Sequence, residues 1–521
     1  MYGVRTHPRR LPTLAERYSA RQNAFGVLRL LLAGGVIVAH SWPLGFGLPS
    51  PGHAFSSGQS DLSTLSVYGF FFIAGFLITE SGLRSSLRQY LWARFLRIFP
   101  GLWVCLLVTA FGLAPLVALY ERGSLDGFWS HPEGPFDYLT TNWLASMEQF
   151  PISGLLAETP FGQVVGGPSA FAGSLWTLRY DLAFYAVIAV LLGTGLLRRT
   201  PRAVLLLAVG CYLLLLRDVL AAPTWTARPP AHGAVGPIPL IGSFAADWML
   251  QLGFLFLLGA VARLYAHRIP LHGAMAAVAA TLVVATLWRG GFFALGLPAY
   301  GYLVLYLAVA LPRRLAWLGQ GRDYTYGVYI YGFPVQQVLA LLGAQRFGLA
   351  GYILLSLLGA LLFAIPSWHL VEGPASRWKR RGPGATYRRR HGVGDRPEPP
   401  APQPRPVPDT GARTAAVQVA AVQAAPVQHG AAQAVAAEAG AAQIGAAPAG
   451  VGRVAGERTD RGSRPGSRPP ARHRRPARPA GALLARYLRR RTPALTAGPT
   501  HRAVRAAGER PEADTVTDGA R

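Results

Sequence analysis

The sequence predicts an all-α polytopic membrane protein of about ten transmembrane helices, followed by a disordered cytoplasmic C-terminal tail. Apolar runs of about 20 residues, the length that crosses the hydrocarbon core of a bilayer, recur up to residue 378. Charged residues make up 14% of the 521 residues, whereas a soluble domain carries about 25%. Arginines gather in every second loop between the apolar runs, as the positive-inside rule requires.

Ten apolar segments are long enough to be transmembrane helices. They cover residues 24–42, 63–82, 100–120, 174–196, 203–222, 241–262, 271–288, 292–311, 324–343 and 348–370. Short breaks at Gly291 and Gln345 separate the seventh segment from the eighth and the ninth from the tenth. No cleavable signal peptide is expected, because the first apolar run is a full span without a small-residue cleavage site.

The arginines predict the orientation of these segments. If there are ten spans, the arginine-rich loops and both termini all fall on one side, which the positive-inside rule makes cytoplasmic. The basic residues concerned are Arg5, Arg9, Arg10, Arg17, Arg21, Arg84, Arg88, Arg94, Arg97, Arg198, Arg199, Arg202, Arg263, Arg268, Arg313, Arg314, Arg322, Lys379, Arg380 and Arg381. The largest opposite loop, residues 121–173, is rich in acidic residues instead. We therefore expect a multi-pass protein of the cell membrane with both termini in the cytoplasm.

Composition divides the chain into three parts. Residues 1–22 form a cytoplasmic N-terminal segment, 23–378 the membrane domain, and 379–521 a basic tail rich in Ala, Pro and Arg. The tail lacks sustained apolar runs, so we expect it to be disordered. About half of the basic residues lie in this tail, so the net charge of +27 does not indicate nucleic acid as a partner. Two cysteines, Cys105 and Cys211, sit far apart in apolar runs and exclude a disulfide scaffold.

The first span contains two ionisable residues, Arg29 and His40. They are eleven residues apart, which is close to three helical turns, so they share one helix face about 16 Å apart along the axis. Taken singly, Arg29 could be a snorkelling interfacial arginine and His40 a hydrogen-bonded packing residue. Their shared face favours a polar cavity, because ionisable groups inside a bilayer are costly.

Two further arginines, Arg94 and Arg97, are three residues apart just before Pro100. On a helix they would lie side by side, and two adjacent guanidiniums suit a phosphate group. The alternative interpretation is ordinary positive-inside topology, because any cytoplasmic loop collects arginines.

Asp181 lies inside the fourth span, about two turns from its outer end. A buried carboxylate needs a cation or hydrogen-bond donors, and Arg179 is the nearest candidate in the sequence. The ninth span begins with a tyrosine-rich segment, residues 324–334, which contains Gly and Pro. Such breaks occur where backbone lines a cavity, although an ordinary kinked helix explains them equally. Glu372, after the last span, could pair with a cytoplasmic arginine.

These motifs, taken together and in this order, resemble the membrane acyltransferase family 3 over residues 23–378. In the family, a basic residue in the first span is followed by ten residues and then a histidine, and Arg29 and His40 match this pattern. The family motif Arg-x-x-Arg-x-x-Pro matches Arg94, Arg97 and Pro100. Further matches are residues 69–78 with Ala74 in place of Ser, residues 175–181 with Asp181 in place of Glu, residues 326–334 with Gly332 in place of His, and Glu372 with Pro374. An Asp common before the first-span Arg is Gly26 here.

The resemblance implies transfer of an acyl group, acetyl by expectation, from cytoplasmic acyl-CoA to a hydroxyl of a cell-surface carbohydrate or related acceptor. It implies a catalytic group of His40, Arg29 and Asp181, with His40 as base, and it assigns the CoA phosphates to Arg94 and Arg97. No metal is expected, and the sequence leaves the oligomeric state open. From the residues alone, a transporter or flippase of a glycan or lipid-linked substrate remains a rival, because buried charges and broken helices are typical of both classes. A scaffold whose basic tail recruits a partner is a third possibility.

Overall fold

The computed structural model describes residues 11–20, 23–238, 242–311 and 323–379. The chain divides into two units, Met1–Ala449 and Gly450–Arg521, and all of the described residues belong to the first. Apart from Lys379, the predicted disordered tail therefore lies outside the described residues.

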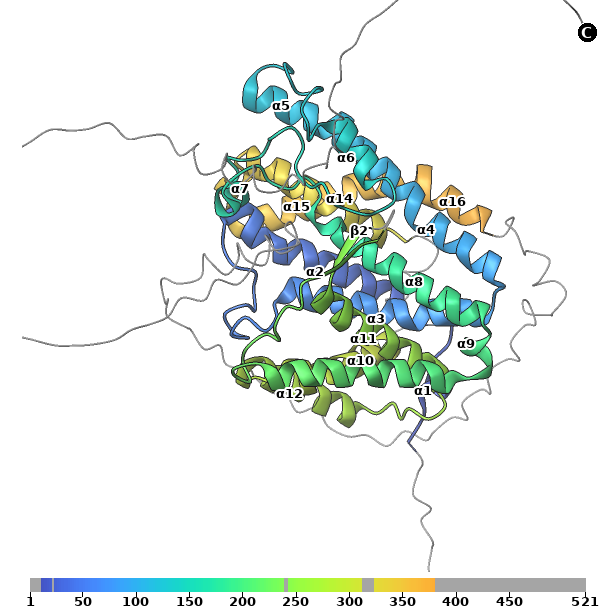
Figure 1. Cartoon of the computed structure of the whole chain (residues 1–521). Coiled ribbons are helices and arrows are strands. Elements are labelled where there is room, and N and C mark those ends of the chain that lie inside the picture. Colours follow the sequence, from blue (N-terminus) through green and yellow to red (C-terminus); the bar gives the residue numbers. More distant parts are fainter. Residues whose placement is uncertain (1–10, 21–22, 239–241, 312–322, 380–521) are drawn as a thin grey trace, which may run out of the picture. The chain divides into compact units, whose positions relative to one another are not determined.

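The described residues form a bundle of helices (Figure 1). Up to residue 199 the helices are α1 (Leu14–Arg17), α2 (Phe25–Phe46), α3 (Leu62–Leu83), α4 (Leu87–Leu107), the π-helical η1 (Val108–Leu113), α5 (Ala114–Arg122), α6 (Pro135–Asn142), α7 (Pro160–Val165), the 3₁₀ turn η2 (Gly173–Trp176), α8 (Thr177–Gly193) and α9 (Leu196–Arg199). After them come α10 (Pro201–Ala221), the antiparallel strands β1 (Ala234–Ile238) and β2 (Gly242–Ala245), α11 (Ala246–Leu264), α12 (Gly273–Arg289), η3 (Phe292–Gly296), α13 (Leu297–Ala310), α14 (Thr325–Leu341), η5 (Ala344–Phe347), α15 (Gly348–Ser367), η6 (Trp368–Glu372) and α16 (Gly373–Trp378).

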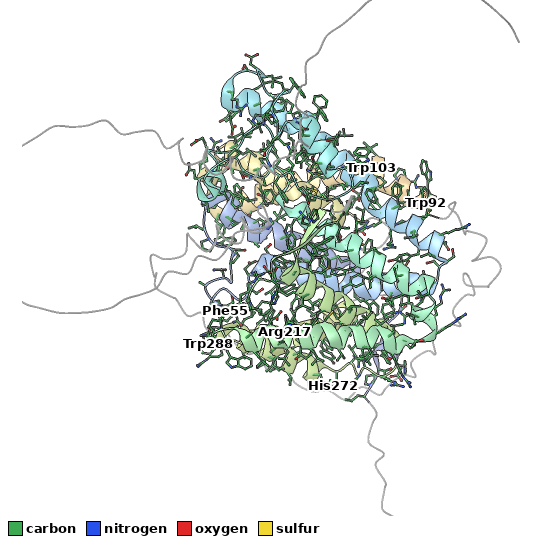
Figure 2. The ribbon with its side chains drawn as sticks, in the orientation of Figure 1. Phe55, Trp92, Trp103, Arg217, His272 and Trp288 are labelled. Atoms are coloured by element: carbon green, nitrogen blue, oxygen red, sulfur yellow. The ribbon has the colours of Figure 1, made fainter. Side chains whose placement is uncertain are left out.

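This architecture confirms the predicted all-α membrane fold. In the part of the chain that the structure describes, eight helical stretches are long and apolar enough to cross a membrane. The other two predicted segments are also helices, α12 and α14, but each has only 17 residues. Outward-facing leucines mark the lipid side, because Leu206 of α10 and Leu362 of α15 are each 70% exposed. Trp288, near the C-terminal end of α12, is also exposed and suits a membrane interface (Figure 2).

Two glycines let α3 and α11 cross at close range. A Cβ on Gly75 of α3 would lie 1.8 Å from the carbonyl oxygen of Phe256, and a Cβ on Gly259 of α11 would lie 2.1 Å from that of Phe72. Small residues at a helix crossing are the usual device for tight packing in membranes, where no hydrophobic force drives helices together. This contact holds α3 firmly, and α3 in turn lines the candidate site.

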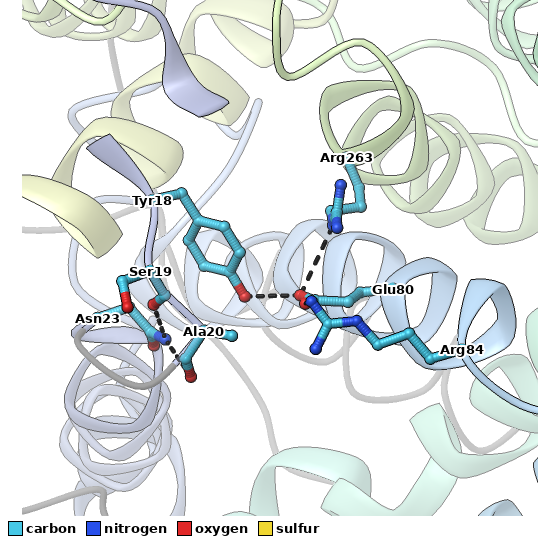
Figure 3. A network of polar contacts seen from close by, with 7 residues as sticks. All are labelled: Tyr18, Ser19, Ala20, Asn23, Glu80, Arg84 and Arg263. Carbon is cyan, nitrogen blue, oxygen red and sulfur yellow. Dashed lines mark hydrogen bonds and ion pairs between the residues drawn. The ribbon is translucent and has the colours of Figure 1, made fainter. Parts of the chain in front are cut away.

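One face of the bundle gathers the N-terminal segment and several of the arginine-bearing turns. The buried carboxylate of Glu80 accepts a hydrogen bond from the Tyr18 hydroxyl at 2.6 Å and pairs with Arg84 at 2.6 Å and Arg263 at 3.6 Å (Figure 3). Burial and the neighbouring Glu80 raise the pKa of the Tyr18 phenol. Three loops that are far apart in sequence therefore share this face, as the arginine pattern predicts. We call it the basic face.

The loops of the opposite face contact one another as well. Gln59 donates to the carbonyl oxygens of Thr286 and Leu287 at 3.2 and 3.1 Å and accepts from the backbone of Phe292. The carboxylate of Glu148 accepts from the backbone N–H of Ser243 at 3.0 Å. These contacts tie the α2–α3 loop to the end of α12 and to η3, and the α6–α7 loop to β2.

Candidate active site

Two cavities of about 150 Å³ each lie along α2, α3 and α14. One is lined by His40 and opens toward the loops opposite the basic face, and we call it the histidine cavity. The other is lined by Arg29, Arg94, Arg97 and Asp181, and we call it the arginine cavity. The predicted site residues are therefore brought together in two groups rather than one.

His40 occupies the histidine cavity with a hydroxyl beside its ring. Its Nε2 lies 3.1 Å from Oγ of Ser63, at the second residue of α3. The ring also makes an edge contact with Phe333 of α14, with the centroids 5.5 Å apart. Among the described residues, Ser63 is thus the hydrogen-bond partner of His40, and both side chains line the cavity.

The loop before α3 positions Ser63. Asp61 caps the helix, because its carboxylate accepts from the backbone N–H of Thr64 at 2.9 Å and from the Thr64 hydroxyl at 3.1 Å. The Ser50 hydroxyl approaches the same carboxylate at 3.4 Å. Our sequence interpretation missed Asp61 and Ser63, although an Asp three residues before a Thr at the start of an apolar run is a recognisable cap signal.

Two arginines of the arginine cavity pair with an acidic residue that our motif analysis also missed. Oδ2 of Asp323 lies 3.0 Å from Arg29 and 2.9 Å from Arg97. Burial raises the pKa of Asp323, but the two guanidiniums outweigh it and hold that pKa well below its usual range. One carboxylate thus joins α2, α4 and the start of α14. Arg29 is therefore paired with a carboxylate inside the bundle and is not a snorkelling residue.

Arg94 differs from Arg97, although the two were predicted to act alike. Its guanidinium lies over the rings of Tyr90 and Tyr185, at 5.8 and 5.7 Å from the centroids. No described carboxylate forms an ion pair with it, and its buried Nε has no hydrogen-bond partner among the described residues. Arg94 is thus available to an anion in the cavity, whereas Arg97 is already paired.

The structure corrects the expected partner of Asp181. Arg179 points away from it and donates to the backbone carbonyls of Ser243 and Met147, which tie α8 to the loops opposite the basic face. Asp181 instead lines the arginine cavity, where its neighbours include the three arginines. Adjacent residues on a helix point about 100° apart, so residues two apart, such as 179 and 181, face different sides.

The tyrosine-rich segment forms a continuous helix, although α14 contains Pro334. Tyr329 and Phe333 line cavities, as expected of a site helix. A Cβ on Gly332 would lie 2.8 Å from Ile37, so α2 leaves no room for a histidine there. Glycine at position 332 thus lets α14 pack closely against α2, and this packing accounts for the absence of the family's histidine at that position.

The end of the membrane domain differs from expectation in one respect. Glu372 accepts a hydrogen bond from the Ser367 hydroxyl at 2.9 Å, and no described arginine forms an ion pair with it.

Lys379, just after α16, has its pKa lowered to about 7 by burial and by the charges of Arg97 and Arg94. A fourth cation therefore acts on the arginine cavity, and no sequence motif indicated it.

Comparisons with known proteins agree with one another. The profile of a family described as an acyltransferase domain matches residues 22–369. Nodulation protein 10 of Rhizobium leguminosarum bv. viciae is 29% identical over 386 residues, which cover 70% of this chain and 95% of that protein. An O-acetyl transferase of Shigella phage Sf6 is 27% identical over 363 residues, which cover 68% of this chain and 95% of that protein. No solved structure matches this chain.

Proposed function

The chain belongs to the membrane acyltransferase family 3, and we propose that it moves a short acyl group from cytoplasmic acyl-CoA to a hydroxyl of a cell-surface carbohydrate or related acceptor. That it is a multi-pass membrane acyltransferase follows from the family and the fold. The donor, the acceptor and the orientation are the proposal. A relative named as an O-acetyl transferase supports acetyl as the acyl group and oxygen as its destination.

The observation that carries the proposal is the end-to-end arrangement of the two cavities. Helices α2, α3 and α14 line both, and Arg29 and His40 on α2 are eleven positions apart, or about 16 Å along the axis. A donor held at one membrane face and an acceptor held at the other could therefore meet inside the bundle. A site on one surface would not need this arrangement.

Charge supports the assignment of the donor to the arginine cavity. Three guanidiniums and the carboxylate of Asp181 line that cavity, and the carboxylate of Asp323 pairs with two of the same arginines, so positive charge is in excess. Arginine binds phosphate oxygens through charge-assisted and often bidentate hydrogen bonds. The cavity lies toward the basic face, which the positive-inside rule makes cytoplasmic, where acyl-CoA is available. Arg94, which has no carboxylate partner, is the best placed to bind a phosphate.

Side-chain chemistry supports the assignment of the acceptor to the histidine cavity. Trp176 and Trp248 line it with ring centroids 4.9 Å apart, and indole rings pack well against the apolar faces of sugars. An imidazole such as that of His40 is a suitable general base for a hydroxyl. The acceptor hydroxyl would displace the Ser63 hydroxyl from Nε2 or pass its proton through it.

The reaction then follows as one addition and one elimination. His40 takes the proton of the acceptor hydroxyl while that oxygen attacks the thioester carbonyl. The C–O bond forms, the C–S bond breaks, and the proton passes to the departing thiolate of CoA. Arg29 and Asp181 line the arginine cavity, so we assign to them the positioning of the donor for attack rather than proton transfer.

Sealed membrane vesicles of both orientations test the proposal. Inside-out vesicles expose the proposed cytoplasmic face, so radiolabelled acetyl-CoA in the medium should label the glycan only in these vesicles. Intact right-side-out vesicles should become labelled only after the donor is loaded inside them. Labelling from the outside of right-side-out vesicles would show that the orientation is the reverse of the proposed one. A lack of label in any glycan would exclude a carbohydrate as the acceptor.

A further inference from the structure

Two side chains, Val67 of α3 and Tyr329 of α14, line both cavities. Every other lining residue described here faces only one of the two. Val67 and Tyr329 therefore form the partition between the arginine cavity and the histidine cavity. Val67 is one helical turn beyond Ser63, so the His40 partner and the partition share one face of α3.

Hydrogen bonds hold the Tyr329 ring in the partition. Its hydroxyl donates to the carbonyl oxygen of Ser174 at 2.8 Å and lies 2.7 Å from the hydroxyl of Thr177. Its ring makes an edge contact with Phe70 of α3, with the centroids 5.8 Å apart. The ring is thus fixed between α8 on one side and α3 on the other, and Val67 completes the barrier.

We propose that Val67 and Tyr329 form the constriction that the acyl end of the donor must pass, and that they determine the largest acyl group transferred. The inference rests on the proposed function, because it takes the donor phosphates to lie in the arginine cavity and the base to be His40. A constriction formed by a rigid aromatic ring and a branched side chain lets the methyl of an acetyl group pass more readily than the flexible chain of a longer acyl group. The enzyme should therefore prefer acetyl and exclude acyl chains of about six carbons.

The chain offers a matched pair of valines for the test. Val67 is 6% exposed and lines both cavities, whereas Val36 of α2 is 3% exposed and lines only the histidine cavity. Transfer from acetyl-, butyryl- and hexanoyl-CoA is measured per unit of inserted protein for wild type, Val67→Ala and Val36→Ala. Wild type should transfer acetyl at least tenfold faster than hexanoyl. Val67→Ala should raise the hexanoyl-to-acetyl ratio about tenfold, and Val36→Ala should leave it near the wild-type value.

A second variant keeps the test decisive if the smaller side chain destabilises the bundle. Val67→Phe should narrow the passage and suppress transfer of every acyl group, while CoA should still raise the thermal unfolding temperature as it does for wild type. Equal ratios in Val67→Ala and Val36→Ala, or full acetyl transfer by Val67→Phe, would overturn the constriction. If the wild-type protein itself does not transfer acetyl, the result would instead contradict the proposed function on which this inference rests.

Discussion

Asp323 joins Arg29 and Arg97 through a single carboxylate oxygen, at 3.0 and 2.9 Å. Arg29 comes from the first span, Arg97 from α4, and Asp323 lies just before α14. The two guanidiniums share one negative charge, so the group keeps a net positive charge while each arginine stays in place. Asp323 is thus suited to hold the arginine cavity in shape without neutralising it.

Replacement of this shared carboxylate should destabilise the bundle. Asp323→Asn leaves two partly buried guanidiniums without their counter-ion. Breaking a fully buried pair costs about 3–5 kcal/mol, and we expect less here, roughly 1–3 kcal/mol, because the three side chains keep 16–27% of their exposure. Thermal unfolding in detergent measures the change. Asp126→Asn, in an exposed loop, is the control, and an equal effect of both variants would show that Asp323 has no special role.

Replacement of Arg94 should change the KM for the acyl donor far more than the KM for the acceptor. Its guanidinium has no described carboxylate partner, so Arg94→Ala removes an anion contact without leaving an unpaired acid. A charge-assisted hydrogen bond contributes about 1.5–3 kcal/mol, so the KM for acyl-CoA should rise roughly 10- to 100-fold, and Lys should rescue only partly. Arg88→Ala, an exposed arginine of the same helix, should leave this KM unchanged. Equal changes in the donor and acceptor KM of Arg94→Ala would indicate a folding defect instead.

The sequence predicted the helical fold and several of the residues that line the two cavities, because both depend on local patterns. Apolar length predicts a span, and the spacing of Arg29 and His40 predicts a shared helix face. Contacts between distant segments leave no such local signal. Asp323 lies 294 residues from Arg29, and Ser63 lies 23 residues from His40, so neither pairing could be read from spacing. Arg179 was a wrong choice for the same reason, since nearness in sequence to Asp181 does not make the two side chains meet.

Lys379 should make donor affinity depend on pH around neutrality. Burial and the guanidiniums of Arg97 and Arg94 lower its pKa to about 7, so Lys379 is mostly charged below pH 7 and mostly neutral above it. The charged form attracts the anionic donor, and the KM for acyl-CoA should therefore rise as the pH rises from 6 to 8. A charge interaction of roughly 1 kcal/mol corresponds to about a fivefold rise.

The lysine contribution is isolated by comparing wild type with Lys379→Met across this pH range. CoA phosphates also ionise near pH 6, but that change affects both proteins alike. The ratio of the two KM values should therefore approach one above pH 8. Arg377→Met removes an exposed cation of α16 and should leave a constant ratio at all pH values. A constant ratio for Lys379→Met as well would exclude titration of Lys379 as the cause.

The orientation of the bundle should place the long loop between α5 and α8 outside the cytoplasm. Pro132 lies exposed in that loop, opposite the basic face that gathers the arginine-bearing turns. A reporter inserted at Pro132 should be active in the extracytoplasmic space, and one inserted at Arg88 should be active in the cytoplasm. A cytoplasmic signal from position 132 would contradict the proposed topology and the separation of donor from acceptor.

His40 should be essential for transfer and dispensable for folding. The loss of a general base costs roughly 10²- to 10⁴-fold in rate, so His40→Ala should be inactive although it inserts normally. His40→Gln keeps a polar group that can hydrogen-bond to Ser63, but it cannot accept a proton near neutral pH, so it should be nearly as inactive. Ser63→Ala keeps the imidazole and removes only its partner, so it should lose less activity than either His40 variant.

These three variants separate a base from a packing residue because they differ in what they preserve. If His40 only packs against Phe333 and bonds to Ser63, the Gln variant restores that bond and should keep its turnover. The damage in His40→Ala would then appear as lower abundance of inserted protein. If His40 is the base, abundance stays normal and turnover falls in both His40 variants. Acyl transfer per unit of inserted protein, measured with saturating acetyl-CoA, therefore decides between the two roles, and wild-type turnover in His40→Gln would move the base to another residue of the histidine cavity.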